Sequence, residues 1–250
     1  MSQAVAHRVI ILGAQSAIAE AAARLFAAEG AQLVLAGRDL GRLNEIGDDL
    51  RVRGAAAVNA MELDLVAERS PIARLAEADE ALGGASVILI AFGVLGDEER
   101  AETDAGEARR IIDGNFTSAA VWALAAANLL ERRRAGVLMA IGSVAGDRGR
   151  ASNAVYGAAK AGLAALMQGI AHRLAGTGAR ALVIKPGTVD TPMTAAFDKG
   201  PLWSKPEAIA RVIWRAADRG GPVLYAPRWW RYLMWIVRAM PAPIMHRTRL

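Results

Sequence analysis

Short apolar runs alternate along the chain with longer segments in which apolar residues recur every three or four positions. Such short runs are typical of strands buried on both faces, and the longer periodic segments are typical of amphipathic helices. The pattern predicts seven strands, at Arg8–Leu12, Gln32–Ala36, Val58–Leu63, Ser86–Ala91, Gly136–Ser143, Arg180–Ile184 and Val223–Tyr225.

Between the strands, the helical pattern is punctuated by glycine and proline. It predicts helices at Ala17–Glu29, Leu40–Arg53, Pro71–Leu82, Ala105–Glu131, Tyr156–Leu174 and Ser204–Arg219. Ser204-Lys205-Pro206-Glu207 resembles a capping box with an early proline. Apolar strands that alternate with helices require a parallel sheet covered on both faces, with right-handed crossovers and a ligand crevice at the strand C-termini. We therefore expect an α/β fold with a doubly wound parallel sheet.

Size and composition fit one domain. The chain has 250 residues, 54% of them hydrophobic, and lacks cysteine. A chain of this length can bury one large core, which we expect over residues 1–227, and the absence of thiols fits a reducing cytoplasm. The histidines are scattered and lack ligand-spaced carboxylates, so we expect no metal site; they are His7, His172 and His246.

The net charge of +5 is concentrated at the end of the chain, where Arg219–Leu250 holds six arginines and no acidic residue. Interspersed tryptophans argue against a nucleic-acid partner. We call residues 228–250 the C-terminal tail. No run of eighteen apolar residues is present, so we expect no membrane-spanning helix.

Within the tail, Arg228–Met240 can form an amphipathic helix that Pro241 and Pro243 end. Its apolar face follows i, i+3, i+4, i+7 spacing, through Trp230, Leu233, Met234 and Val237. Tryptophan favours the bilayer interface, and arginine attracts anionic headgroups. The helix is therefore predicted either to lie on the inner face of a membrane, or to pack on the protein's own sheet edge or on a second subunit.

Candidate chemistry centres on Tyr156 and Lys160, which share one helix face, with Ser143 thirteen residues before the tyrosine. A lysine cation near a phenol favours the phenolate and lowers the pKa of the tyrosine from about 10. Such a tyrosine can exchange a proton with an alcohol or a ketone. Ser143 lies at the C-terminal end of a predicted strand, which is the edge of the sheet where the ligand crevice is expected.

A nucleotide loop is predicted between the first strand and the first helix, through Gly13, Gln15, Ser16, Ala17 and Ile18. Backbone N–H groups at a helix N-terminus bind pyrophosphate. Alanines, at positions 17 and 19, stand where two further glycines are usual, so an ordinary turn is the alternative.

The second strand ends near the expected ribose position. Arg38 there could pair with a 2′-phosphate, which favours NADP(H) over NAD(H). The adjacent Asp39 could take the opposite role and hold a free ribose hydroxyl.

Together these positions resemble the short-chain dehydrogenase/reductase family over residues 8–225. The matching residues, in order, are Gly13, Asn115, Ser143, Tyr156, Lys160 and Pro186-Gly187. The resemblance implies a Rossmann fold and NAD(P)-linked hydride transfer to or from a carbonyl. It implies that Tyr156 is the acid/base, that Lys160 lowers its pKa and holds the nicotinamide ribose, and that Ser143 donates to the substrate oxygen. Asn115 would support a water relay through a helix kink.

The resemblance also implies further cofactor contacts. Asp64-Leu65 matches the pair that reaches the adenine, and Ala91-Phe92-Gly93 stands where the family often has Asn-Ala-Gly. The loop after the sixth strand would contact the nicotinamide amide and the pyrophosphate. Its candidate residues are Pro186, Gly187, Thr188, Val189 and Thr191.

A closer likeness is to the decaprenylphosphoryl-2-keto-ribose reductases, through Ala91–Asp97, Val155-Tyr156-Gly157 and the segment after Leu224. It implies a polyprenyl-phosphate-linked 2-keto-pentose substrate from cell-envelope polysaccharide synthesis and a flavoprotein oxidase partner. One alternative is a generic soluble reductase of ketones or acyl-carrier substrates whose tail builds a homo-oligomer interface. Another is a non-catalytic nucleotide-sensing protein.

Overall fold

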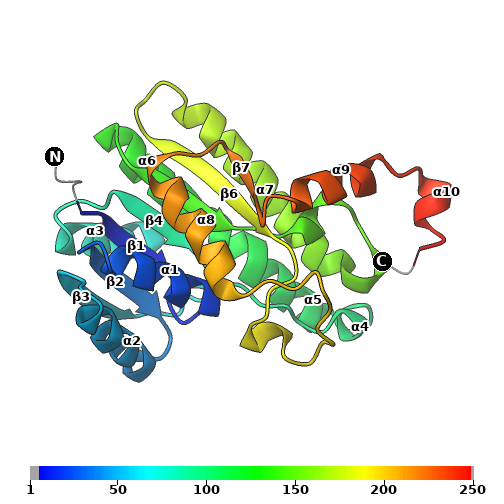
Figure 1. The fold of residues 1–250 in the computed structure, drawn as a ribbon, viewed down its shortest axis with the longest axis horizontal. Coiled ribbons are helices and arrows are strands. Elements are labelled where there is room, and N and C mark those ends of the chain that lie inside the picture. Colours follow the sequence, from blue (N-terminus) through cyan, green and yellow to red (C-terminus); the bar gives the residue numbers. More distant parts are fainter. Residues whose placement is uncertain (1–5, 249–250) are drawn as a thin grey trace.

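All the strands join in one parallel sheet of seven, in the order β3-β2-β1-β4-β5-β6-β7 (Figure 1). The computed structural model describes residues 6–248. The strands are β1 (Arg8–Leu12), β2 (Gln32–Gly37), β3 (Ala57–Glu62), β4 (Val87–Ile90), β5 (Val137–Ile141), β6 (Arg180–Pro186) and β7 (Val223–Ala226). The chain winds to one side through β3 and then returns past β1 to β4. The crevice of a doubly wound sheet lies at this switch between β1 and β4.

Helices cover both faces of the sheet (Figure 1). They are α1 (Ala17–Ala27), α2 (Leu40–Val52), α3 (Pro71–Ala81), α4 (Glu98–Ala101), α5 (Ala105–Ile112), α6 (Ser118–Arg133), α7 (Ala154–Leu174), α8 (Pro206–Asp218), α9 (Trp230–Ala239) and α10 (Ala242–Met245). The predicted α/β fold with a doubly wound parallel sheet is confirmed. The short helices α4 and α10 were not predicted.

Alternation along each strand builds two cores. In β1, Val9 and Ile11 join the core beneath α1, α2 and α8, whereas Ile10 and Leu12 join the core beneath α3, α6 and α7. Successive side chains of a strand point to opposite faces, so a strand with apolar residues at every position must be covered twice. The central strands are therefore fixed on both sides, and their C-terminal ends make a rigid platform.

The predicted helix over 105–131 is interrupted. A π-helical turn, Asp113–Thr117, separates α5 from α6. The Asn115 amide donates to the Ile111 carbonyl at 2.9 Å, and the Ser118 hydroxyl donates to the Asp113 carbonyl at 2.6 Å. These side chains satisfy carbonyls that the wider turn leaves without regular partners.

The capping box predicted at Ser204 is wrong. Helix α8 begins one residue later, with Lys205 as its N-cap and no side-chain capping bond. Ser204 instead forms an extended bridge with Val189, and its N–H donates to the Thr188 carbonyl at 3.0 Å. Backbone pairing therefore determines the conformation of Ser204.

The tail forms α9 and α10 at one end of the molecule, beyond β7 (Figure 1). The predicted apolar face is present but packs on the protein itself. Trp230, Met234 and Val237 are buried against Val144, with Tyr225 and Leu233 partly buried around them. Of the two alternatives for this face, packing on the protein itself is confirmed, and membrane contact through this face is wrong because the loop after β5 already covers it. Arg249 and Leu250, at the end of the predicted tail, lie outside the described residues, as do residues 1–5 at the other end.

Within residues 6–248, no helix is both long and apolar enough to cross a membrane.

Candidate active site

Helix α7 carries Tyr156 and Lys160, and the loop after β5 lies against this helix through two glycines. A methyl group on Gly146 would lie 2.7 Å from the Ala161 backbone nitrogen. One on Gly157 would lie 3.0 Å from the Ala145 carbonyl oxygen. The small residues allow the loop to approach the helix closely, which brings Ser143 to Tyr156. The structure therefore unites the predicted serine, tyrosine and lysine.

The electrostatics of this cluster differ from the expectation. Burial raises the pKa of Tyr156, and a hydrogen bond with Ser143 acts in the opposite direction without overcoming it. Burial also lowers the pKa of Lys160 to about 8. The Lys160 ammonium lies 5.8 Å from the centre of the Tyr156 ring and donates to the Ile141 carbonyl at 3.1 Å. The prediction of a lowered tyrosine pKa is therefore wrong for the protein alone, because desolvation of the phenol outweighs the hydrogen bond with Ser143.

Asn115 is brought to the same place by the π-helical turn. Its amide donates to the Val94 carbonyl at 2.6 Å, and its carbonyl oxygen accepts from the Val94 N–H at 3.3 Å. A methyl group on Gly93 would meet the Asn115 oxygen at 2.6 Å and the Lys160 nitrogen at 3.3 Å. Gly93 thus lets the chain after β4 pass between these two side chains. Ala91, at the end of β4, is buried and its N–H donates to the Leu12 carbonyl.

In the loop between β1 and α1, one position has a backbone conformation and a close contact that require glycine. Gly13 has φ of +91°, and a methyl group there would lie 2.7 Å from the Phe92 nitrogen. Ala17 opens α1, and Ala19 follows inside the helix, so neither needs a positive φ. The Ser16 side chain makes no capping bond, which leaves the first N–H groups of α1, including that of Ile18, available to an anion. The loop therefore fits a pyrophosphate without its usual extra glycines.

Gln15 connects this loop to the end of β2. Its side-chain oxygen accepts from the Arg38 N–H at 3.1 Å, and its amide donates to the Asp39 carbonyl at 3.4 Å. The Asp39 carboxylate caps α2 by accepting from the Arg42 N–H at 2.9 Å. The Arg38 side chain is exposed. Because Asp39 is engaged as a cap, the arginine is the group at this edge better suited to meet a ribose substituent.

The end of β3 carries Asp64 and Leu65. The Asp64 carboxylate accepts from the N–H groups of Val66 and Ala67 at 3.0 and 3.2 Å, which closes a turn. Leu65 is buried, and its carbonyl accepts from the Trp122 indole at 2.8 Å. Both residues fix the shape of this edge of the crevice.

After β6, the chain turns across the same edge. A methyl group on Gly187 would overlap the indole ring of Trp230, so the tail lies directly against Pro186-Gly187. Val189 is buried, and Thr191 caps a short 3₁₀ turn by exchanging hydrogen bonds with Thr194. The tail residue Trp230 is thus part of the wall next to this loop, a position that the sequence pattern did not predict.

Glu98 of α4 is a second residue that the sequence analysis missed. Its carboxylate accepts from the Val155 N–H at 2.7 Å and from the Tyr156 N–H at 3.4 Å. A carboxylate at a helix N-terminus satisfies free N–H groups and complements the helix dipole. Glu98 therefore caps the helix that carries Tyr156. No local signal could reveal this contact, because 57 residues separate Glu98 from Val155.

A buried charge cluster fixes the loop after Ser143. Asp147 accepts from Lys185 and from the Tyr225 hydroxyl, the latter at 2.7 Å. The lysine and aspartate side chains are 8% and 2% exposed. Burial, together with the Asp147 carboxylate, raises the pKa of Tyr225 to about 12. The cluster thereby joins this loop to β6 and β7.

Comparisons with known proteins identify the family. Residues 7–201 match the family described as short chain dehydrogenase. An uncharacterised oxidoreductase of Mycobacterium tuberculosis (strain ATCC 25618 / H37Rv) is 36% identical over 241 residues, which cover 96% of each chain. One from Streptomyces coelicolor is 35% identical over 240 residues, covering 96% of this chain and 94% of the relative.

Solved structures show the same fold. A putative gluconate dehydrogenase from Agrobacterium tumefaciens gives a TM-score of 0.79 at 25% identity, covering 89% of this chain and 95% of that one. An actinorhodin polyketide ketoreductase solved with NADPH gives 0.77 at 22% identity, covering 88% and 95%. The chain belongs to the short-chain dehydrogenase/reductase family. It is an NAD(P)-dependent oxidoreductase.

Proposed function

We propose that this enzyme reduces a ketone, with Tyr156 as the proton donor. The observation that carries the proposal is the convergence of Ser143, Tyr156 and Lys160 at the C-terminal end of β5. A tyrosine whose pKa is raised by burial stays protonated at neutral pH, as a proton donor to a developing alkoxide must be. The bound dinucleotide supplies the hydride.

The other side chains position this chemistry. Ser143 would donate a hydrogen bond to the substrate oxygen and hold it next to the phenol. Lys160 would hold the nicotinamide ribose, and its carbonyl partner Ile141 fixes the side chain. Asn115, held between Val94 and Ile111, would support a water that returns the proton to Lys160. Asp64 and Leu65 would line the adenine end, and the Gly13 loop the pyrophosphate.

The test is Tyr156→Phe, which removes one oxygen. We expect turnover of a ketone panel, followed by loss of NAD(P)H absorbance, to fall by about 10²–10⁴-fold while cofactor binding persists. Tyr232→Phe is the matched control, because this tyrosine is 72% exposed on α9. Wild-type turnover in Tyr156→Phe would refute the assignment of the proton donor.

For the cofactor, we propose NADP(H) in preference to NAD(H), on the strength of the exposed Arg38 at the end of β2. Arg38→Ala should weaken NADPH binding by about 1.5–3 kcal/mol and leave NADH nearly unchanged. Titration of both cofactors against both proteins measures this. Equal losses for the two cofactors, or a wild-type preference for NADH, would contradict the assignment.

For the substrate, we propose a polyprenyl-phosphate-linked 2-keto-pentose, made by a flavoprotein oxidase partner. The observation in favour is a second apolar face on α9, opposite the buried one. Its exposed residues are Trp229, Tyr232, Trp235 and Ile236. Aromatic side chains beside arginines suit an interface of anionic lipid, where a lipid-linked substrate resides. This face replaces the predicted one as the candidate membrane contact.

Sedimentation with anionic vesicles tests the membrane contact. The intact protein should co-sediment at low salt, and Trp235→Ser should bind clearly less. Ile72→Ser is the control, because Ile72 is comparably exposed but lies on α3. Absence of binding by the intact protein would favour the alternative, a reductase of small ketones or acyl-carrier substrates.

We also propose a homo-oligomer, because Val121 and Leu124 expose apolar side chains on α6. Light scattering of the purified protein measures the oligomeric state, and a strict monomer would contradict this proposal.

A further inference from the structure

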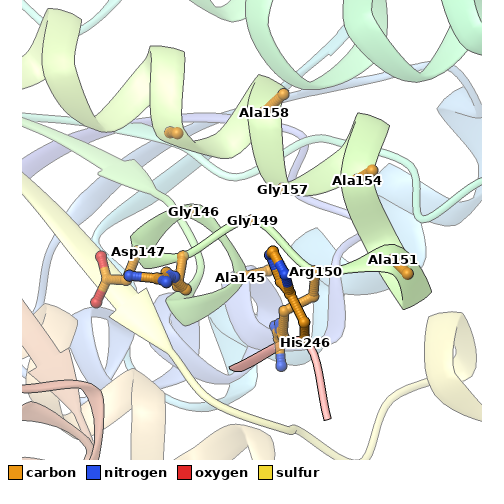
Figure 2. A pocket seen from close by; sticks show the side chains of 12 residues that line it. Ala145, Gly146, Asp147, Gly149, Arg150, Ala151, Ala154, Gly157, Ala158 and His246 are labelled. Carbon is orange, nitrogen blue, oxygen red and sulfur yellow. The ribbon is translucent and has the colours of Figure 1, made fainter. Parts of the chain in front are cut away.

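A cavity that is open to solvent lies beside the catalytic helix. It has a volume of about 430 Å³ and is lined by the loop 145–151, one face of α7 and the exposed His246 of the tail (Figure 2). Along α7 its wall consists of Ala154, Gly157, Ala158 and Ala161. None of the four proposed catalytic side chains lines it. The cavity is therefore separate from the site of proton transfer, although it adjoins the segments that carry Ser143 and Tyr156.

The charged groups around this cavity are mainly basic. Arg148, Arg150 and His246 line it, together with one acid, Asp147. The Asp147 carboxylate is already engaged by Lys185 and Tyr225, and Figure 2 shows it pointing away from Arg150 and His246. The Arg148 guanidinium donates one hydrogen bond to the Arg238 carbonyl, at 3.1 Å. Asp147 is the one carboxylate among the lining residues and pairs with Lys185, and within residues 6–248 neither Arg148 nor Arg150 forms a salt bridge.

Arg150 is the most informative of these residues. Its Nε is buried and has no hydrogen-bond partner in the described part of the chain. Burial alone lowers the pKa of its guanidinium. A buried N–H donor without an acceptor is unfavourable, and an anion in the cavity would remove that penalty. Arg150 is thus arranged to receive an acceptor that the protein itself does not provide.

Helix α7 contributes little charge to this cavity. Glu98 already accepts from the Val155 and Tyr156 N–H groups at the helix N-terminus. An anion in the cavity must therefore be bound by the side chains that line it, not by the N-terminus of α7. Two planar guanidinium groups and an imidazole offer donors in several directions, which suits the several oxygens of a phosphoryl group better than the two oxygens of a carboxylate.

We propose that this cavity binds the phosphoryl group of an organic phosphate, held by Arg150 with Arg148 and His246. Water occupies about 30 Å³ per molecule in the liquid, so the cavity has room for far more than a phosphate ion. The alanine and glycine wall leaves that room free of bulky side chains. A phosphorylated sugar is an occupant of matching size and polarity. The proposal does not depend on the reaction at Tyr156.

Calorimetric titration of the full chain tests the proposal, with inorganic phosphate, ribose 5-phosphate and unphosphorylated ribose as probes. Arg150→Gln should bind ribose 5-phosphate at least tenfold more weakly than the wild type, and Arg150→Lys should fall between them. Arg211→Gln is the matched control, because it removes the same charge from an exposed position of α8. If the probes bound at the Gly13 loop instead, all these variants would bind them as tightly as the wild type.

Three results would overturn the proposal. Equal binding of ribose 5-phosphate by Arg150→Gln and the wild type would exclude a role for Arg150. An equal loss in Arg211→Gln would indicate diffuse attraction by the basic chain. Inorganic phosphate as tight as ribose 5-phosphate would indicate a site for the free ion only. Thermal melting checks that each variant is folded. A separate NADPH titration reports on the proposed function, so that either idea can fail alone.

Discussion

Gly187 is the position where a single methyl group should have the largest measurable effect on the tail. A methyl group there would overlap the Cε2, Nε1 and Cζ2 atoms of Trp230, whose side chain is buried against Val144. The indole must then shift, at about 1–3 kcal/mol for an overpacked core, or leave its position, at about 3–5 kcal/mol for a lost aromatic side chain. We expect Gly187→Ala to lose about 3 kcal/mol of unfolding free energy. For a chain of this length, that loss lowers the melting temperature by about 6–12 °C.

Urea unfolding followed by tryptophan fluorescence measures this loss. Gly169→Ala is the matched control, because a methyl group on that helical glycine would meet nothing within 4 Å. The control should be neutral or slightly more stable than the wild type. Trp230→Leu removes the overlapping atoms, so Gly187→Ala should cost much less in that background. Wild-type stability of Gly187→Ala, or strict additivity of the two changes, would refute the proposed packing.

Three further predictions concern charged side chains. Glu98→Ala removes the cap of α7 and should reduce the unfolding free energy by about 1 kcal/mol in urea, with a parallel loss of turnover; an unchanged variant would contradict the capping role. Asp147→Asn leaves Lys185 without its anion and should cost about 3–5 kcal/mol, whereas Asp147→Leu with Lys185→Met should recover most of that loss. Lys160 has a folded-state pKa of about 8 against an ordinary 10.5, so between these pH values the unfolded state binds more protons. The stability of the wild type relative to Lys160→Met should therefore rise from pH 8 to 10.5, by about 3 kcal/mol in urea unfolding; a fall would contradict the lowered pKa.

Local patterns predicted most of the fold because strands buried on both faces leave an unambiguous record in the sequence. The residue clusters at strand ends were predictable for the same reason, since parallel strands bring their C-termini to one edge. Gly93, which follows β4, lies at that edge, and there it meets Asn115 of the π-helical turn and Lys160 of α7. The roles of these residues remain predictions that the variants above can test.

The features that the sequence did not predict depend on contacts between segments that are distant in the chain. The tail helix has apolar residues on two faces, and periodicity alone could not decide which one Val144 would cover. Ser204 followed a capping pattern, but strand-like pairing with Val189 determined its backbone. The pKa of Tyr156 depends on how deeply the phenol is buried, which a spacing of four residues does not report.

The position of Trp230 against Gly187 means that the wall beside Pro186 is completed by a segment that follows β7 in the chain. Chains grow from the N-terminus, so the sheet from β1 to β6 can assemble while the wall beside Pro186 is still missing. The same feature matters for damage by proteases, which cut exposed connections such as Arg228-Trp229 between β7 and α9. A cut before α9 would leave most of the core intact and remove one side of the crevice. An aged preparation could thus retain its secondary structure and lose its activity.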